Sequence, residues 1–472
     1  MQRMKTGVLR RALEQWYLIL IGFFLILRVF FWFSPDHAEK MNLVYLWPMI
    51  VAAVALVVAS HRRMLPKAFY LLAALFVWLL FSCAVNGDPY LVYNHAFIQY
   101  LFTGMIGFFL VIPTLREGQA EVGFRRLATL YCLLMLLLAG LGLFSALTGT
   151  PIQTKLSERA IYVASNRLYF FQYHPNEAAS AMTIGAMLLL YLALHSRNWL
   201  LKGLQALGAL LLGVIIALTG SRTSMILFAL GFGAFAFWLV WSRPMRRVRW
   251  ARWPVSLAVF CVVALLGYQG IAQSIGVVAS LTLKIEAAAN PVEASEAAAS
   301  AEIETGAPHA AQTEVVHMYA ARQQFQDLGT LNMRLEIWQT GIDYLKEHPK
   351  ALLFGVPDNV ISRIPASAGR PESHMHNAYL EMLLMGGIPG ILLYLGYLAF
   401  VLRACWQLAF RKESTVAHRL LAVIPVLIAV NGLTEIYPLF SGNVMDMMSF
   451  AISGAVITLA GRRGEIALPR NG

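Results

Sequence analysis

The chain has 472 residues, of which 58% are hydrophobic and 13% are charged, and its mean hydropathy is +0.62. Soluble domains carry about 25% charged residues, so this composition excludes a soluble globular protein and indicates an integral membrane protein. The net charge of +12 does not indicate a nucleic-acid partner, because the basic residues punctuate apolar segments. They fit membrane topology and anionic head groups, so we expect membrane lipids as partners and no nucleic acid.

Apolar runs long enough to cross a bilayer recur along the chain, since a span needs about 20 residues. The sequence therefore predicts an all-α, polytopic membrane protein with about twelve transmembrane helices. The first run follows a basic N-terminal segment without a small-residue cleavage site, so we expect a retained helix. The predicted spans are 14–34, 41–60, 67–85, 94–113, 124–148, 174–195, 200–219, 222–241, 254–275, 376–402, 420–437 and 444–461.

Lysine and arginine are concentrated in alternate loops, which predicts the orientation of the helices. Short basic loops such as 242–253 and 403–419 are expected on the cytoplasmic side, together with both termini. Polar chemistry is therefore expected on the outer face. That face receives the loop 149–173, the hairpin 219–222, the long loop 276–375 and the turn 435–443.

The long loop divides the chain into three parts. Residues 1–275 hold the first nine helices, 276–375 form the outer loop, and 376–472 hold the last three helices and a cytoplasmic tail. A single large loop breaks any symmetry between two halves, which counts against a transporter built from repeats.

Within the loop, apolar residues recur every three or four positions, which predicts an amphipathic helix that ends at His348-Pro349. Such a helix is suited to the outer membrane surface. A second helix is predicted over about 311–326, and the Ala/Glu-rich stretch 285–306 is expected to be mobile or weakly helical. The apolar positions of the first helix are Leu331, Leu335, Trp338, Ile342 and Leu345.

Two histidines, His374 and His376, lie where a polar segment turns into a long apolar run. Histidine exchanges a proton near neutral pH, so this edge is a candidate active site; the alternative is the ordinary polar end of a loop. Asn377 is a favoured helix N-cap and would hold His376 at the rim. Glu381 is costly in lipid, so we expect it to face a cavity or a partner. The glycine-rich segment 386–390 permits close helix packing or a kink.

Arg222 begins the predicted eighth helix, where unpaired N–H groups and a bidentate guanidinium suit a phosphate or diphosphate. The alternative is an arginine that snorkels to anchor the hairpin. The same two interpretations apply to Arg28, in the outer third of the first helix. Arg334 flanks the amphipathic stripe and either points towards the site or is a solvated charge.

The outer loop before the sixth helix adds Lys155, Arg159 and Arg167, followed by His174-Pro-Asn176. Metal and nucleotide motifs, in contrast, are missing from the sequence. It has no CxxC pair, no metal-spaced His/Cys cluster, no P-loop and no Asp-x-Asp pair on the outer face. We therefore expect no disulfide, no zinc site, no cofactor and a metal-independent reaction.

These motifs together resemble the O-antigen ligase (WaaL-type) family and the related O-antigen polymerases. The resemblance covers roughly residues 160–440, and the order and topological placement of its short motifs make it specific. The matching motifs are Leu-Thr-Gly-Ser-Arg222, Arg334 with Trp338 and the later His348-Pro349 and Phe354-Gly355, His376-Asn377-x-x-Leu380 with Gly386, and His174-Pro-Asn176.

The resemblance implies a membrane glycosyltransferase with a GT-C-like helical fold on the periplasmic face of the bacterial inner membrane. Its donor would be an undecaprenyl-diphosphate-linked glycan, and its acceptor a sugar hydroxyl of the lipid A-core oligosaccharide. The resemblance implies His376 as the catalytic base, although the nearby His374 leaves that choice open. It implies Arg222 and Arg334 as diphosphate ligands in place of a metal. Further candidate diphosphate ligands, suggested by their position on the outer face and their positive charge, are Arg28, Arg159, Arg167 and Lys155.

Three other functions stay open at this stage. An O-antigen or exopolysaccharide polymerase would use the same donor with a lipid-linked glycan as acceptor, and a protein O-oligosaccharyltransferase would use a protein. A polysaccharide or lipid transporter would place its functional charges near the bilayer midplane, whereas this sequence places them at one edge.

Overall fold

The structure, a computed structural model, describes most of the chain but not all of it. The described residues are 2–30, 48, 51–55, 58, 65–87, 96–115, 119–153, 160–164, 167–171, 174–242, 252–289, 329–361, 363–364, 374–436 and 443–461. The predicted helix 311–326, and the part of 285–306 beyond Ala289, lie outside these residues.

Helices long enough to cross a membrane dominate the described chain, and nine of them are also apolar enough. The structure is therefore that of an all-α polytopic membrane protein, as predicted, whereas the span 41–60 lies largely outside the described residues. The nine are α1 (Gln2–Phe30), α3 (Lys67–Val85), α6 (Gln119–Thr148), α7 (Pro175–His195), α8 (Trp199–Thr219), α9 (Arg222–Trp241), α10 (Arg252–Ala289), α17 (Ala378–Phe410) and α19 (Val444–Gly461). Shorter apolar helices are α18 (Val416–Asn431) and the segment Tyr100–Thr114, where α4 (Ala96–Phe102), the π-helix η1 (Thr103–Phe109) and α5 (Val111–Thr114) follow one another.

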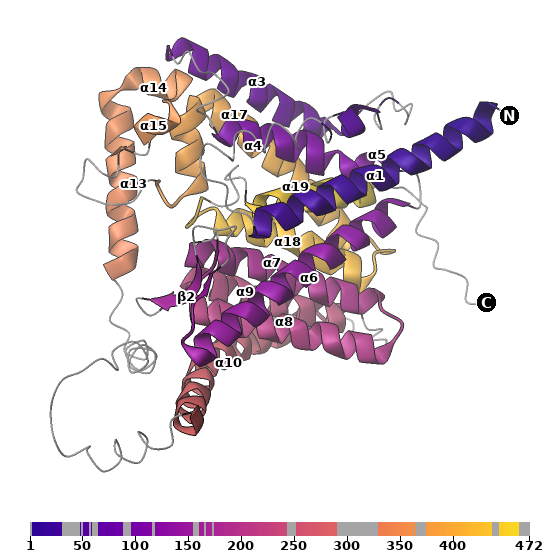
Figure 1. Cartoon of the computed structure of the whole chain (residues 1–472). Helices are drawn as coiled ribbons and strands as arrows, with labels where there is room; N and C mark the ends of the chain where they lie inside the picture. Colours follow the sequence, from indigo (N-terminus) through magenta and orange to yellow (C-terminus); the bar gives the residue numbers. More distant parts are fainter. Residues whose placement is uncertain are drawn as a thin grey trace.

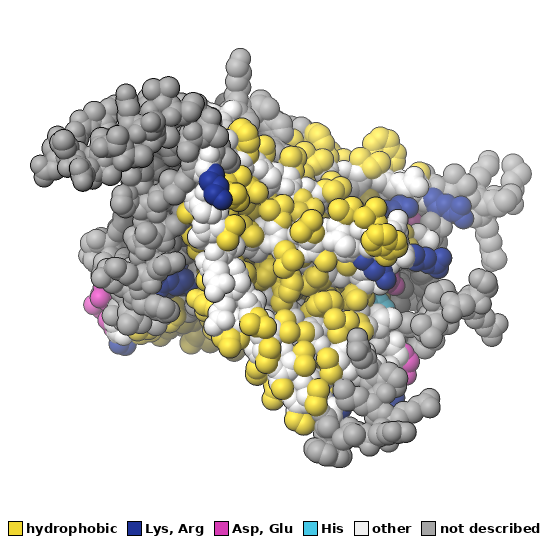
Figure 2. Space-filling model, turned by 90° about the horizontal axis from the view of Figure 1, so that it is seen from below, with side chains coloured by type: hydrophobic (Ala, Val, Ile, Leu, Met, Phe, Trp, Pro, Cys, Tyr) yellow, Lys and Arg dark blue, Asp and Glu magenta, His cyan; other side chains and the backbone are white. Residues whose placement is uncertain are grey.

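The flank of the helical bundle is apolar, as a surface in contact with lipid requires. Leu133, Leu204 and Leu265 are more than half exposed there, whereas Phe124 and Tyr131 are fully buried between helices. Figure 2 shows apolar side chains across the middle of one face, with Lys and Arg gathered mainly at its right-hand end. This is the end at which α1 starts in Figure 1.

The helices form two groups that α18 joins. Helices α6 to α10 pack together, α17 packs against α3, and α18 contacts α17, α7 and α9 (Figure 1). The helix α13 (Gly329–Glu347) lies across the ends of the bundle, away from the start of α1. It is followed by α14 (Pro349–Phe354) and α15 (Asp358–Ile361).

A small antiparallel sheet lies in the loop before α7, where the sequence analysis assigned no strand. It consists of β1 (Ile152–Gln153), β2 (Ala160–Ala164) and β3 (Arg167–Tyr169) in the order β1-β2-β3. Ile161 is buried while its neighbour Tyr162 is exposed and stacks on Tyr169, so the strands follow the two-residue period of a sheet with one buried face. These strands are too short for that period to stand out in the sequence.

The amphipathic helix predicted before His348-Pro349 is present as α13, and part of its apolar stripe remains exposed. Ile337 and Leu345 are buried, whereas Leu335 and Ile342 are 50% and 42% exposed. α13 therefore buries only part of its apolar stripe against the bundle.

The predicted kink in α17 occurs at Gly387, whose φ of 62° and ψ of −166° interrupt the helix two residues before Pro389. Trp78 of α3 donates from Nε1 to the freed carbonyl of Gly386 at 2.6 Å. α14 packs so closely into the kink that a Cβ atom on Gly387 would lie 2.6 Å from the carbonyl oxygen of Leu353. The kink therefore allows α14, near the end of the outer loop, to pack against the membrane helix α17.

Replacing Gly387 with alanine is expected to destabilise the protein. A left-handed conformation costs an alanine about 1–2 kcal/mol, and its Cβ would also press on the α14 backbone. Thermal unfolding of the purified protein in detergent measures the effect. Gly396→Ala in the same helix is the matched control, because a Cβ there meets Leu71 at an ordinary 3.5 Å. Equal melting temperatures for the two variants would contradict this role of Gly387.

Candidate active site

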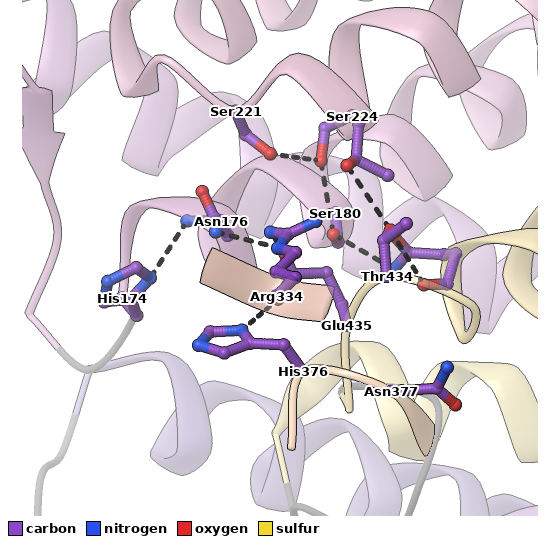
Figure 3. A network of polar contacts seen from close by, with 12 residues as sticks. His174, Asn176, Ser180, Ser221, Ser224, Arg334, His376, Asn377, Thr434 and Glu435 are labelled. Atoms are coloured by element: carbon purple, nitrogen blue, oxygen red, sulfur yellow. Dashed lines mark hydrogen bonds and ion pairs between the residues drawn. The ribbon is translucent and has the colours of Figure 1, made fainter. Parts of the chain in front are cut away.

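A buried carboxylate, Glu435, joins side chains from distant parts of the chain at one end of the bundle (Figure 3). Glu435 follows α18, and its side chain is 1% exposed. Arg334 of α13 places Nη2 2.7 Å from Glu435 Oε1, and His376 places Nδ1 3.4 Å from Oε2. Asn176 at the start of α7 donates from Nδ2 to Oε1 at 2.9 Å. One carboxylate therefore holds together α13, α7 and the segment that precedes α17.

The surroundings of Glu435 favour its ionised form. Burial by itself raises the pKa of this carboxyl, but the hydrogen bond with His376 and the charge of Arg334 outweigh burial and lower the pKa overall. Glu435 is therefore a carboxylate at neutral pH. Because a buried charge is tolerated when it is paired and hydrogen-bonded, both partners are needed for its stability.

The two neighbouring histidines differ in their environments. The side chain of His376 is 16% exposed, and with its proton on Nδ1 towards Glu435 it leaves Nε2 as an acceptor. His374 packs its ring edge-on against that of His376, with centroids 4.2 Å apart. Burial and the neighbouring His376 lower the pKa of His374 to about 3, which makes it a weak base at neutral pH. His376 is thus the better placed of the two to accept a proton.

The backbone of His376 is held in an unusual conformation. Its φ of +50° is the one positive value at a non-glycine residue in the described chain, and such residues tend to occur at functional sites. Asn377 caps α17 by accepting from the N–H groups of Tyr379 and Leu380, and its Nδ2 donates to the carbonyl of Leu433 at 3.2 Å. These contacts fix the imidazole beside the segment that follows α18.

Glu381 supports the same turn from inside the bundle. Its side chain is buried, and Oε2 accepts a hydrogen bond from the backbone N–H of Met375 at 2.8 Å. Met375 lies between the two histidines. Glu381 therefore positions their backbone.

Asn176 extends the contacts to the hairpin between α8 and α9. Arg167 of β3 donates from Nη2 to Asn176 Oδ1 at 3.3 Å and to the carbonyl of Gly220 at 3.4 Å. His174 caps α7 and accepts the N–H of Asn176 at Nδ1. Arg222 begins α9 two residues after Gly220, and its side chain is exposed. β3, α9 and α13 each carry an arginine and lie at the same end of the bundle.

Hydroxyl and amide groups behind the carboxylate fix the helix ends. Ser221 donates to Ser224 Oγ at 3.0 Å, Ser180 and Ser224 share a hydrogen bond of 3.2 Å, and Asn431 donates to Ser180 at 3.1 Å (Figure 3). These bonds link α9, α7 and α18. They set the position from which the segment carrying Glu435 leaves the bundle.

Another predicted arginine, Arg28, does not join this group. Arg28 packs its guanidinium against Tyr100, 4.7 Å from the ring centroid, and against Phe24. This cation–π packing accounts for an arginine in the first membrane helix without a phosphate ligand. Arg159, like Lys155, lies outside the described residues.

Glu435 is the residue that the sequence analysis did not select, although it named the turn that Glu435 begins. A signal was present, because an acidic residue directly after an apolar helix is costly unless it finds a partner. The identity of that partner was not visible, since Arg334 lies 101 residues away in the chain.

The comparisons with known proteins concern a segment that carries six of the predicted site residues. A family model described as O-antigen ligase matches residues 207–395, which is less than half of the chain. The match includes Arg222, Arg334 and His376, and excludes Asn176 and Glu435. No curated protein matches the chain, and no solved structure matches it. Over this segment, the chain is similar to the O-antigen ligase family.

Proposed function

We propose that the chain is an O-antigen ligase, a membrane glycosyltransferase of lipopolysaccharide biosynthesis. It would transfer a polysaccharide from undecaprenyl diphosphate to a sugar hydroxyl of the lipid A-core oligosaccharide. The observation that carries this proposal is the group His376, Glu435 and Arg334, which combines an oriented base with a cation suited to a diphosphate. Two of its members lie inside the segment that matches the O-antigen ligase model.

We place the reaction on the periplasmic face of the bacterial inner membrane, with both termini in the cytoplasm. The distribution of charge supports this orientation, because Lys and Arg gather mainly at the end of the bundle remote from α13 (Figure 2). Glu435 and α13 then belong to the periplasmic end.

In the proposed reaction, the acceptor hydroxyl attacks the anomeric carbon of the donor sugar while the bond from that carbon to the diphosphate oxygen breaks. His376 Nε2 takes the hydroxyl proton, and Glu435 stabilises the imidazolium through Nδ1. The electron pair of the broken bond leaves with undecaprenyl diphosphate, whose added charge Arg222 and Arg334 stabilise. A single displacement of this kind inverts the anomeric centre and requires neither nucleotide nor metal.

The ion pair with Glu435 leaves Arg334 able to bind a phosphate. A guanidinium has five N–H donors, and the contact with Glu435 involves Nη2. The remaining donors are available to the donor diphosphate. The side chain is 20% exposed, which leaves it accessible from outside the bundle.

The reaction assay uses purified protein, undecaprenyl-diphosphate-linked glycan and lipid A-core, without nucleotide or added divalent cation. We expect full lipopolysaccharide with the wild type and none detectable with His376→Ala, because a general base contributes about 10²–10⁴-fold. His374→Ala is the matched control and is expected to retain measurable activity.

Absence of product with the wild type defeats the proposed ligase. Glycan elongation without lipid A-core would instead indicate the polymerase, and transfer to a protein would indicate the oligosaccharyltransferase. Undiminished activity of His376→Ala would remove this histidine as the base.

Arg222→Ala and Arg334→Ala are each expected to lose at least about tenfold in rate, since a charged hydrogen bond contributes about 1.5–3 kcal/mol. Initial rates in the same assay measure this loss. Lys346→Ala serves as control, because Lys346 is exposed on α13 and pairs with Asp343. Wild-type rates in both arginine variants would place them outside the site.

Glu435→Gln is expected to lower the rate at least about tenfold, because the neutral amide no longer stabilises an imidazolium at His376. The substitution keeps the side-chain shape and an oxygen that can accept from Arg334 and Asn176. If Glu435 acts only as a hydrogen-bond acceptor in packing, the rate will stay at the wild-type level. Melting temperatures of both proteins separate a loss of folding from a loss of activity.

A further inference from the structure

A second group of titratable side chains lies at the far ends of two helices that border the candidate active site. α7 begins beside Asn176 and ends at His195, while α18 starts beside His418 and ends before Glu435. A helix of 21 residues such as α7 is about 30 Å long, which is the thickness of a bilayer core. The group is therefore on the opposite side of the membrane from Glu435.

The group consists of Glu121 of α6, His195 of α7 and His418 of α18. Nε2 of His195 lies 2.8 Å from Glu121 Oε1, and Nε2 of His418 lies 3.6 Å from the same oxygen. One ligand atom from each residue lies within 4.8 Å of the other two. Imidazole nitrogen and carboxylate oxygen are typical ligands of Zn²⁺ and neighbouring divalent transition metals.

His418 supplies a second, independent observation. Its side chain is 3% exposed, and neither ring nitrogen has a hydrogen-bond partner among the described residues. A polar group buried in this way destabilises a protein unless a partner takes it up. A cation held between Nε2 and Glu121 would be such a partner.

A contact with the backbone orients His195 so that its Nε2 can also bind a cation. Nδ1 lies 2.9 Å from the carbonyl oxygen of Tyr191, so a proton on Nδ1 leaves the lone pair of Nε2 directed at Glu121. A bond of this kind fixes the tautomer that metal-binding histidines use. Two ligand atoms about 2.0–2.1 Å from a tetrahedral zinc are about 3.3 Å apart. The two distances to Glu121 Oε1, 2.8 and 3.6 Å, lie on either side of that value.

The arginine next to His418 is directed away from the group. Arg419 donates from Nη1 to Ser242 Oγ at 2.6 Å, and its guanidinium packs on the ring of Trp238. It therefore faces the end of α9 and leaves the Glu121 carboxylate to the two histidines.

We propose that Glu121, His195 and His418 bind Zn²⁺ or a similar divalent transition metal and so tie together the ends of α6, α7 and α18. Three protein ligands leave a fourth position for water. No metal site was predicted from the sequence, because each of the three ligands comes from a separate helix. The proposal does not depend on the proposed glycosyl transfer.

The test uses the full-length protein in detergent, with any affinity tag removed, after chelator treatment and equilibration with Zn²⁺. Metal analysis after gel filtration is expected to give one Zn²⁺ per chain. Glu121→Gln and His418→Gln are each expected to weaken Zn²⁺ binding at least about tenfold. His348→Gln, outside the group between α13 and α14, is the matched control and is expected to bind like the wild type.

Substitution with Co²⁺ keeps the test decisive if a variant folds poorly, since it is read from the wild type. Visible absorption typical of tetrahedral Co²⁺ supports the site, and its loss on Zn²⁺ addition shows competition for the same ligands. A wild-type protein without stoichiometric metal, or unchanged binding in both variants, overturns the proposal. The two histidines and Glu121 would then interact only with one another, as imidazolium and carboxylate groups without a metal.

Discussion

The candidate active site depends on a buried carboxylate that must be paired. Glu435 is nearly inaccessible to solvent, and Arg334, His376 and Asn176 supply its partners. Each partner comes from a different element, so stabilising one charge fixes α13, the start of α7 and the segment before α17 relative to α18. The same contacts orient the imidazole of His376. In the proposed reaction, the bonds that stabilise Glu435 are therefore also the bonds that orient the base.

Close backbone packing brings the outer loop to this carboxylate. α14 packs into the kink of α17, where Gly387 and Gly355 leave no room for a side chain. Because α13 comes directly before α14, the packing of α14 in the kink determines the position of Arg334 on α13. The left-handed backbone of His376 and the cap at Asn377 complete the arrangement one helix end away. The two glycines at the kink therefore determine where the charged side chain of Arg334 lies.

Much of the fold and part of the site could be predicted from the sequence. Apolar runs near 20 residues mark the membrane helices, because lipid requires every backbone polar group to be bonded within its own helix. Short motifs can be recognised at helix ends and beside apolar stripes. Site residues at such positions are His376, Asn377, Arg222, Arg334 and Asn176. The amphipathic period of α13 and the glycine-rich kink of α17 are equally local signals. Each involves residues within a few turns of one another.

Only the tertiary structure decided which of these local features come into contact. Glu435 has no local motif, and its role appears when Arg334 and His376 arrive from other elements. The buried face of α13, the small sheet before α7 and the group Glu121, His195 and His418 likewise depend on which helices become neighbours. The sequence by itself determined a membrane-spanning helical chain with histidine and arginine at the helix ends, because periodicity and burial in lipid act locally. The pairing of charges was left to packing, because an ion pair requires proximity in space and not in sequence.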